Sequence, residues 1–225
     1  MPSWNLHCAH AQYVIDNYDY KQLGINDPNC YVFGNYVPDI YVGYMVQPIT
    51  KTIRYTTTHF AVPETIPIPS YDEFWDVAIQ SSLDLGHKVD DIVLGAWAHL
   101  VADSLYNTYT KIWLKEHDVP EGEQARVMKQ GDFEKYGRTL NLHYMCQVTP
   151  SLLRQSKDFC MYSIEEVDAR ASVEVANSIV DRASRYDEYF IPNYELFTSW
   201  WFEMVSTKVN NKIIEGLTLY ASQVK

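Results

Sequence analysis

Hydrophobic residues recur every three or four positions along most of this chain, and that spacing is the period of an amphipathic or buried α-helix. The pattern predicts a first helix over residues 4–18, directly after Ser3 in the N-cap position. It predicts a second helix from the capping box of Ser70 and Glu73 to Gly86. Because no stretch alternates apolar and polar residues over the length of a strand, we expect an all-α fold.

The strongest helical pattern begins at Asp90 and ends near His117. Apolar residues occupy nearly every side of this segment, so other helices should surround it. The sequence therefore predicts one long buried central helix. Two polar side chains that it carries, His99 and Asp103, should be buried together with the rest of the helix.

Further helices are expected in the C-terminal half of the chain. Another capping box, Ser163 with Glu166, predicts the start of a polar amphipathic helix. The last helix should run from about Tyr194 toward the C-terminus. Residues 121–155 are also expected to be helical, with a break near Gly137.

Residues 24–67 contain so many prolines and glycines that short turns joined by irregular chain are expected there. A loop of this length inside a compact domain is usually functional unless it is disordered, and its aromatic residues argue against disorder. No repeat, low-complexity tract or linker divides the chain. We therefore expect residues 1–225 to form a single multi-helix, metal-binding domain, with part of the function in the irregular region.

The composition is that of an ordinary globular protein, because 47% of its 225 residues are hydrophobic and can bury a core. A formal net charge of -11 gives no support to binding of a nucleic-acid backbone. Neither a signal peptide nor an apolar run long enough to span a membrane is present, so we expect a cytoplasmic protein. The run Trp200, Trp201 and Phe202 is typical of core or dimer packing, which leaves a homodimer open.

The chain contains four scattered cysteines with no C-x-x-C pair: Cys8, Cys30, Cys146 and Cys160. Such spacing fits reduced thiols in a cytosolic protein better than a disulfide framework or a zinc ribbon. We therefore expect these thiols to be buried for structural reasons and to form no disulfide bond.

His99 and Asp103 lie four residues apart on the long helix, so their side chains project from one face about one turn apart. A core histidine hydrogen-bonded to an aspartate would explain the pair without a ligand. However, no Lys or Arg lies between Asp91 and Thr110 to neutralise the carboxylate, and burying it without a partner is costly. Gly95, one turn earlier on the same face, leaves room for a ligand. A cation is a natural counter-charge for the Asp103 carboxylate.

Three more candidate ligands lie in the first helix and in the irregular region: His7, Asp39 and His59. Asp39 follows Pro38, whose ring stiffens the chain, and His59 lies among threonines and aromatic residues with no clear helical or strand pattern. Two alternatives stay open: Asp39 could cap a turn, and His59 could lie on the surface. With the pair on the long helix they make three imidazoles and two carboxylates, a set that zinc and other first-row divalent ions favour.

The order of these residues resembles the zinc-dependent phospholipase C family, which shares an all-helical fold with single-strand-specific zinc nucleases. The resemblance covers roughly the N-terminal half, with the opening Met-Pro-Ser-x-x-x-His and the run Gly-Asn-x-x-Pro-Asp. It implies that His59, His99 and Asp103 hold one zinc ion. Asp103 would bridge to a second ion held with His7. Asp39 would be a ligand, or the catalytic base that orients the nucleophilic water.

The chain also departs from the family pattern. Secreted members carry another His beyond the bridging Asp, and a later His followed four residues on by Glu, whereas here His143 is followed by Gln147. We therefore expect one or two zinc ions rather than three, with manganese or another divalent metal as an alternative. His143, and His10 one turn beyond His7, are additional candidates for the site.

These features predict a metal-dependent hydrolase of a small phosphoester, a phospholipase C-like phosphodiesterase whose nucleophile is a metal-activated water. Two alternatives stay open. One is a non-catalytic helical scaffold or binding module with a structural metal. The other is an HD-type nucleotide phosphohydrolase, which the dipeptide His117-Asp118 suggests, although its place just before Pro120 favours a solvated helix end.

Overall fold

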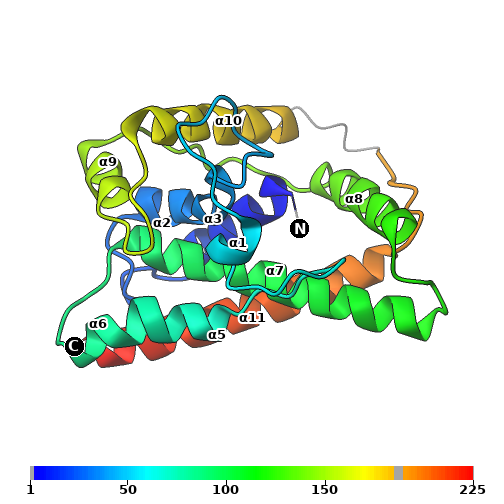
Figure 1. The fold of residues 1–225 in the computed structure, drawn as a ribbon, viewed down its shortest axis with the longest axis horizontal. Helices are drawn as coiled ribbons and strands as arrows, with labels where there is room; N and C mark the ends of the chain where they lie inside the picture. The colour runs from blue at the N-terminus through cyan, green and yellow to red at the C-terminus, as the bar shows by residue number, and fades with distance from the viewer. Residues whose placement is uncertain (1–2, 185–189, 225) are drawn as a thin grey trace.

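The computed structural model describes residues 3–184 and 190–224. These residues form helices joined by irregular segments and contain no strand, which confirms the all-α class (Figure 1). In chain order the elements are α1 (Trp4–Asn17), α2 (Pro28–Gly34), α3 (Val37–Ile40), α4 (Tyr55–Thr58), α5 (Tyr71–Phe74), the π-helical η1 (Trp75–Gln80), α6 (Ser81–Asp84), α7 (Asp91–Glu116), α8 (Glu123–Gly137), α9 (Pro150–Lys157), α10 (Glu166–Ser184) and α11 (Ser199–Gln223).

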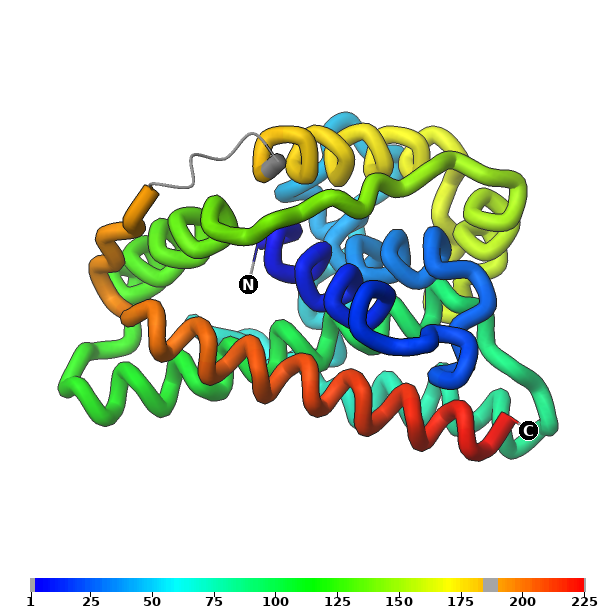
Figure 2. Tube along the Cα trace, turned by 180° about the vertical axis from the view of Figure 1, so that it is seen from behind, coloured from blue at the N-terminus to red at the C-terminus, as the bar shows by residue number. Residues whose placement is uncertain are grey.

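Helix α7 is the long central helix that the sequence predicts. It packs against α2 on one side and against α11 on another, and α11 runs alongside it (Figure 2). Most of its residues are buried, including His99 and Asp103. Among the described residues, no helix combines the length and the apolar composition that crossing a membrane requires.

Two glycines let α2 and α7 approach each other closely. A Cβ atom on Gly95 would lie 2.2 Å from the carbonyl oxygen of Tyr31 and 2.7 Å from the Cα atom of Gly34. The prediction that Gly95 leaves room for a ligand is therefore wrong, because the main chain of α2 fills that space. The crossing brings the end of α2 and the next residue, Asn35, against the helical turn that carries His99.

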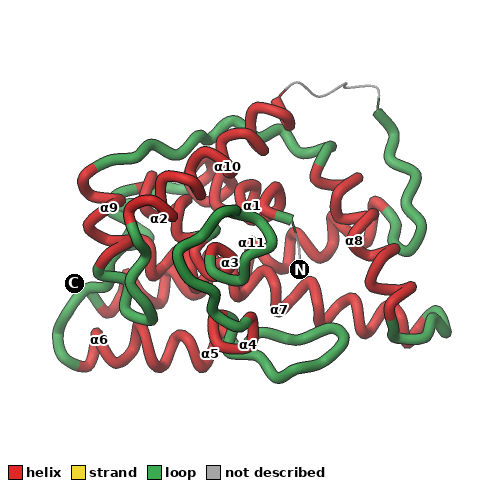
Figure 3. The backbone as a smooth tube through the Cα atoms, turned by 45° about the horizontal axis from the view of Figure 1, so that its top comes forward, coloured by secondary structure: helices red, strands yellow, loops and turns green. Residues whose placement is uncertain are grey.

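The irregular region between α3 and α5 lies on both sides of the short helix α4 (Figure 3). Its first half is fastened to α10 through the buried carboxylate of Asp168, which accepts hydrogen bonds from the Tyr41 hydroxyl (2.8 Å) and from the Thr50 amide (3.1 Å). The four-residue helices α3 and α4 fit the prediction of short turns joined by irregular chain, but the seven-residue helix α2, capped by Asp27, was not predicted. This region is therefore ordered by contacts with distant helices.

Some helix boundaries differ from the prediction. Ser70 caps α5 by accepting a hydrogen bond from the Glu73 amide, as expected, but the helix continues through the π-helical stretch η1 before α6. Ser163 is not the cap of α10, because that helix begins only at Glu166 and its first turn is closed by the Glu165 carbonyl. In both cases the predicted helix exists, and only its detail was missed.

The last helix begins at Ser199 rather than near Tyr194. The reason is Asp132 on α8, whose carboxylate accepts hydrogen bonds from the amides of Glu195, Leu196 and Phe197 at 2.7 to 3.0 Å. These amides are held by a distant side chain, so the helix starts only after Thr198, which caps it.

All four cysteines are free thiols, as expected, but only three of them are buried. Cys160 is exposed in the turn between α9 and α10, so the prediction of burial is wrong for this residue. The other three lie within the single hydrophobic core that the helices enclose.

Candidate metal centre

Five side chains that the sequence marks as candidate metal ligands meet in the interior of the structure. They come from four separate segments: α1 supplies His7, α3 supplies Asp39, His59 follows α4, and α7 supplies His99 and Asp103. None of the five is more than 1% exposed. A cluster of ionisable groups this deep inside a protein requires compensation, either from one another or from a bound ion.

The possible ligand atoms are close enough to surround an ion. Two groups of three have their atoms within 4.8 Å of one another: His7, His99 and Asp103 form one, and Asp39, His59 and His99 form the other. The arrangement can therefore hold a metal ion. A ring nitrogen binds a single ion, and both groups include His99. An ion held in one group would therefore leave the other group without His99 as a ligand.

Hydrogen bonds on the far side of two rings decide where their lone pairs point. Nδ1 of His99 lies 2.8 Å from the carbonyl oxygen of Asn35, which can only accept, so this nitrogen carries the proton. Nδ1 of His59 lies 2.7 Å from Oγ1 of Thr58, and the Thr58 hydroxyl can donate either to this nitrogen or to the Tyr55 carbonyl at 3.3 Å. Nε2 of His99 thus presents a lone pair to the cluster. Nε2 of His59 faces it at 3.1 Å, so a hydrogen atom on His59 or a cation must lie between the two nitrogens.

Several of the inward-facing atoms have no hydrogen-bond partner among the described residues. These are both ring nitrogens of His7, Oδ1 of Asp39 and Oδ1 of Asp103. A buried polar atom left without a partner is unfavourable, and such atoms are uncommon in native proteins. Their concentration at one place fits a bound cation, which would satisfy the oxygens and a nitrogen of His7 together.

Neighbouring side chains fix the orientation of the carboxylates and rings. The indole Nε1 of Trp4 donates to Oδ2 of Asp39 at 3.0 Å, and the hydroxyl of Tyr55 donates to Oδ2 of Asp103 at 3.2 Å. The Tyr55 ring also stacks on His59 with its centroid 3.8 Å away. Partners of this kind hold ligands in place and tune them in known metal sites.

Electrostatics keeps the cluster in the protonation state that metal binding requires. Burial alone would raise the pKa of Asp103, but the neighbouring imidazoles, first among them His99, outweigh it and hold that pKa well below its usual range. The pKa of Asp39 is lowered in the same way against the effect of burial, first by the nearby ring of His59 and then by that of His99. Burial lowers the pKa of His99 to about 3, so this ring is neutral near pH 7. Anionic carboxylates and neutral imidazoles are the forms that coordinate metals.

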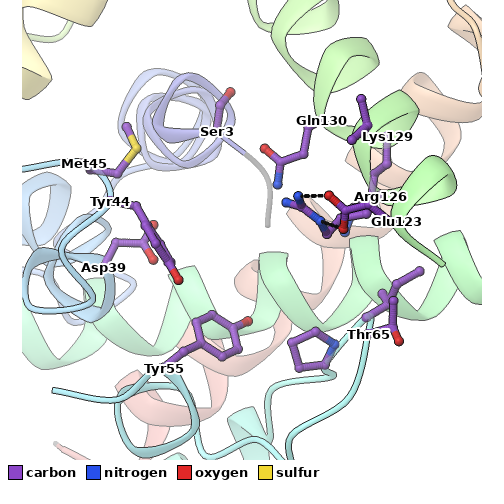
Figure 4. A pocket seen from close by; sticks show the side chains of 13 residues that line it. Ser3, Asp39, Tyr44, Met45, Tyr55, Thr65, Glu123, Arg126, Lys129 and Gln130 are labelled. Atoms are coloured by element: carbon purple, nitrogen blue, oxygen red, sulfur yellow. Dashed lines mark hydrogen bonds and ion pairs between the residues drawn. The ribbon is translucent and has the colours of Figure 1, made fainter.

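A cavity of about 940 Å³ reaches the cluster between α8 and the irregular region (Figure 4). Asp39 and Tyr55 line it on the cluster side, and Arg126 and Lys129 line it on the α8 side. Ser3 also lines it, and its hydroxyl oxygen is buried without a partner instead of capping α1 as the sequence predicts. The rest of the wall is partly apolar and includes Tyr44, Met45 and Ile66.

The two additional candidates do not join the cluster. His10 is buried, but its ring nitrogens face Asn210 (2.7 Å) and Tyr106 (3.3 Å), so both are already engaged. His143 is exposed and pairs with Asp16 at 3.3 Å. His10 was a candidate because of its spacing from His7, and His143 because of the residues that follow it. Both predictions are wrong, because neither signal fixes the direction in which a side chain points.

His117 and Asp118 likewise lie away from the cluster. Both are exposed at the C-terminal end of α7, where His117 is the C-cap residue and its ring stacks on Trp113. Neither belongs to a group of potential ligands within the part of the chain that the structure describes. This placement confirms the prediction of a solvated helix end.

The sequence did not predict the roles of Trp4, Tyr55 and Lys129. Lys129 did leave a signal, because it lies four residues from both Ala125 and Phe133, which are buried on the same face of α8. A lysine in the apolar register of a helix marks a buried cation. The two aromatic residues left no comparable signal, since their roles depend on hydrogen bonds to carboxylates that are remote in sequence.

Comparisons of this chain with protein-family models, with curated proteins and with solved structures find no match. The ligand cluster and its cavity are therefore the basis for any statement about function. Met1 and Pro2, which open the motif that resembles the zinc-dependent phospholipase C family, lie outside the described residues.

Proposed function

We propose that this chain is a metal-dependent phosphoester hydrolase, with zinc as the metal, related in its chemistry to the zinc-dependent phospholipase C family. One observation carries the proposal. Five ligand side chains from four distant segments meet in the interior with unpartnered atoms turned toward one another, beside a cavity. Replacing buried charged groups with hydrophobic side chains of similar volume is often neutral or stabilising, so packing alone does not account for this cluster.

The geometry of Asp103 supports a site for two ions. Its Oδ1 lies 3.3 Å from Nε2 of His7, whereas its Oδ2 lies 3.5 Å from Nε2 of His59 and 3.9 Å from Nε2 of His99. The two oxygens thus face different imidazoles, as a carboxylate shared between two ions would. The family resemblance implies a similar role for Asp103, although the groups of ligand atoms within 4.8 Å place His99 with His7 as well as with His59.

Bound divalent ions would supply a water acidified toward neutrality and positive charge beside the phosphoryl oxygens. The chain's own contribution centres on Asp39, the one ligand of the five that lines the cavity. Trp4 fixes its Oδ2, and Oδ1 has no hydrogen-bond partner. Asp39 is therefore placed to orient a nucleophilic water and to accept its proton at the boundary between cluster and cavity.

The test combines elemental analysis with turnover. Purified protein should contain, or take up, a stoichiometric transition metal and should then hydrolyse generic aryl phosphoesters with zinc or manganese. Asp39→Asn should lower kcat by at least about 100-fold, the usual minimum for loss of a general base. Protein that neither contains nor gains a transition metal when supplied would contradict the proposal.

A structural role for the metal is the second candidate, and the complete burial of the cluster favours it. His7, His59, His99 and Asp103 are all inaccessible to solvent, as the ligands of a closed structural site are. A scaffold of this kind would bind metal and melt at a higher temperature with it, yet show no turnover with any phosphoester. In that case neither the parent protein nor Asp39→Asn would show turnover, and any effect of the substitution would be confined to metal binding and melting.

A further inference from the structure

Lys129 places an ammonium group inside the molecule, on the cavity wall formed by α8 (Figure 4). The residue is only 3% exposed. Burial lowers the pKa of Lys129 to about 8, and the carboxylate of Asp103 acts in the opposite direction. Lysine is rarely buried without a charged partner, because its ammonium group loses strong hydration.

Among the described residues, the hydrogen-bond partner of Lys129 is neutral. Its Nζ donates a hydrogen bond to Oδ1 of Asn107, which is itself buried and donates from Nδ2 to the carbonyl of Pro67 at 2.7 Å. Within residues 3–184 and 190–224, no carboxylate lies in an ion pair with Nζ. The amide therefore fixes the position of the ammonium group but leaves its charge uncompensated at close range.

Arg126, one turn earlier on the same wall, provides the contrast. Its guanidinium forms hydrogen bonds with both carboxylate oxygens of Glu123, and its side chain is 47% exposed. An exposed and paired cation of this kind has most of its charge satisfied already. Lys129 is thus the cation on this wall that an anionic ligand would complete.

We propose that the cavity binds a phosphate monoester, with Lys129 holding the phosphate group and the organic group lying against Tyr44, Met45 and Ile66. This inference rests on the proposed function and names the substrate class of the same site. A phosphate monoester carries close to two negative charges at pH 7, whereas a diester carries one. A cation beyond the five ligands matches the additional charge, and lysine is a common point-charge ligand of phosphate. The substrate class therefore differs from the diester that the family resemblance implies.

The experiment uses the zinc-loaded full chain with two esters that share a leaving group, p-nitrophenyl phosphate and bis(p-nitrophenyl) phosphate. Calorimetric titration with inorganic phosphate measures binding independently of turnover. The variants are Lys129→Met and Lys129→Gln, and Gln keeps a donor for Asn107 in case the apolar residue disturbs the fold. Arg126→Met is the matched control, since it removes a cation from the same wall. Zinc content and melting temperature are measured for each protein.

Both Lys129 variants should weaken phosphate binding and lower kcat/KM for the monoester by about tenfold or more, the usual effect of losing a charge-assisted hydrogen bond. The loss for the diester, and the loss with Arg126→Met, should be under about threefold. Unchanged phosphate affinity in a zinc-loaded Lys129 variant overturns the proposal, as does an equal loss for both esters. If neither ester is turned over while phosphate binding depends on Lys129, the hydrolase proposal fails and the anion site stands.

Discussion

Nε2 of His59 and Nε2 of His99 face each other at 3.1 Å in the interior, and each ring has its other nitrogen engaged on the far side. Because Nδ1 of His99 carries its proton, Nε2 of His99 offers only a lone pair, and the contact needs either a hydrogen atom on His59 or a cation between the rings. The two rings come from separate segments of the chain, so an ion held by both would bind only the folded protein.

Zinc should accordingly raise the melting temperature, and a strong chelator should lower it. A ligand that binds only the folded chain stabilises it by about 2.7 kcal/mol when its free concentration is a hundred times its Kd. The shift should grow with zinc concentration in thermal unfolding monitored by circular dichroism. His99→Ala should abolish most of the shift, and a full shift in that variant would rule out the cluster as the binding site.

Tyr55→Phe should weaken metal binding without unfolding the protein. The substitution removes the hydroxyl that donates to Asp103 and keeps the aromatic ring that stacks on His59. Loss of such a supporting hydrogen bond lowers metal affinity by about tenfold or more in known sites. Competition with a chromophoric chelator measures the change. Tyr44→Phe is the control, because Tyr44 lines the same cavity but is largely exposed.

Gly95→Ala should destabilise the protein and loosen the site together. The added methyl group would meet the Tyr31 carbonyl at 2.2 Å, so α2 must move away from α7 and take the Asn35 carbonyl from His99. We expect a loss of at least about 2 kcal/mol in the free energy of unfolding, typical of overpacking against backbone, with weaker zinc binding.

Gly131→Ala is the matched control for that substitution. Gly131 is also inside a helix, α8, but a Cβ atom there would meet nothing within 4 Å. This variant should gain about 0.5 to 1 kcal/mol, because alanine is the better helix former. Urea denaturation measures the free energy of unfolding of both proteins. Equal changes at the two positions would show that the crossing of α2 and α7 is not tight.

His10 should make the apoprotein sensitive to mild acid. Burial lowers the pKa of His10 to about 4 in the folded state, against an ordinary value near 6.5. The unfolded chain therefore binds more protons between these values, so the stability due to His10 is complete above pH 6.5 and is lost as the pH falls toward about 4. From pH 7 to pH 5 this linkage amounts to about 2 kcal/mol.

A non-titrating residue at position 10 checks the sign. The free energy of unfolding of His10→Gln, measured by urea denaturation with chelator present, should fall less between pH 7 and pH 5 than that of the parent protein. The His10 ring nitrogens face Asn210 and Tyr106, and a glutamine side chain also carries both a donor and an acceptor. Parallel pH profiles for the two proteins would contradict the buried neutral imidazole.

The sequence predicted the helices well where local pattern decides them. The continuous apolar composition of α7 indicated a central helix, and the capping residues Ser70 and Glu73 marked the start of α5. It failed where a distant side chain decides, as Asp132 does for the start of α11. No local pattern reports that three amides will be taken by a carboxylate some sixty residues away.

The candidate ligands divide in the same way. Helical spacing alone paired His99 with Asp103. The other three candidates, His7, Asp39 and His59, were grouped with this pair by the contexts in which they lie and by the resemblance to a family. His10 and His143 fitted the same arguments and lie elsewhere, because residue type and spacing leave the direction of a side chain undetermined. Lys129 was overlooked because a charged residue on a helix is normally assigned to the surface.

All five ligands lie within the first 103 residues, whereas α8, which carries Lys129, comes later in the chain. Under the proposals made above, the chemistry of the site and the choice of substrate are thus encoded in separate stretches of sequence. Substitutions along the cavity side of α8 can change which ester is accepted while the ion-holding residues stay as they are. A helix that contributes nothing to metal binding would then be the natural place for this protein to diverge in specificity.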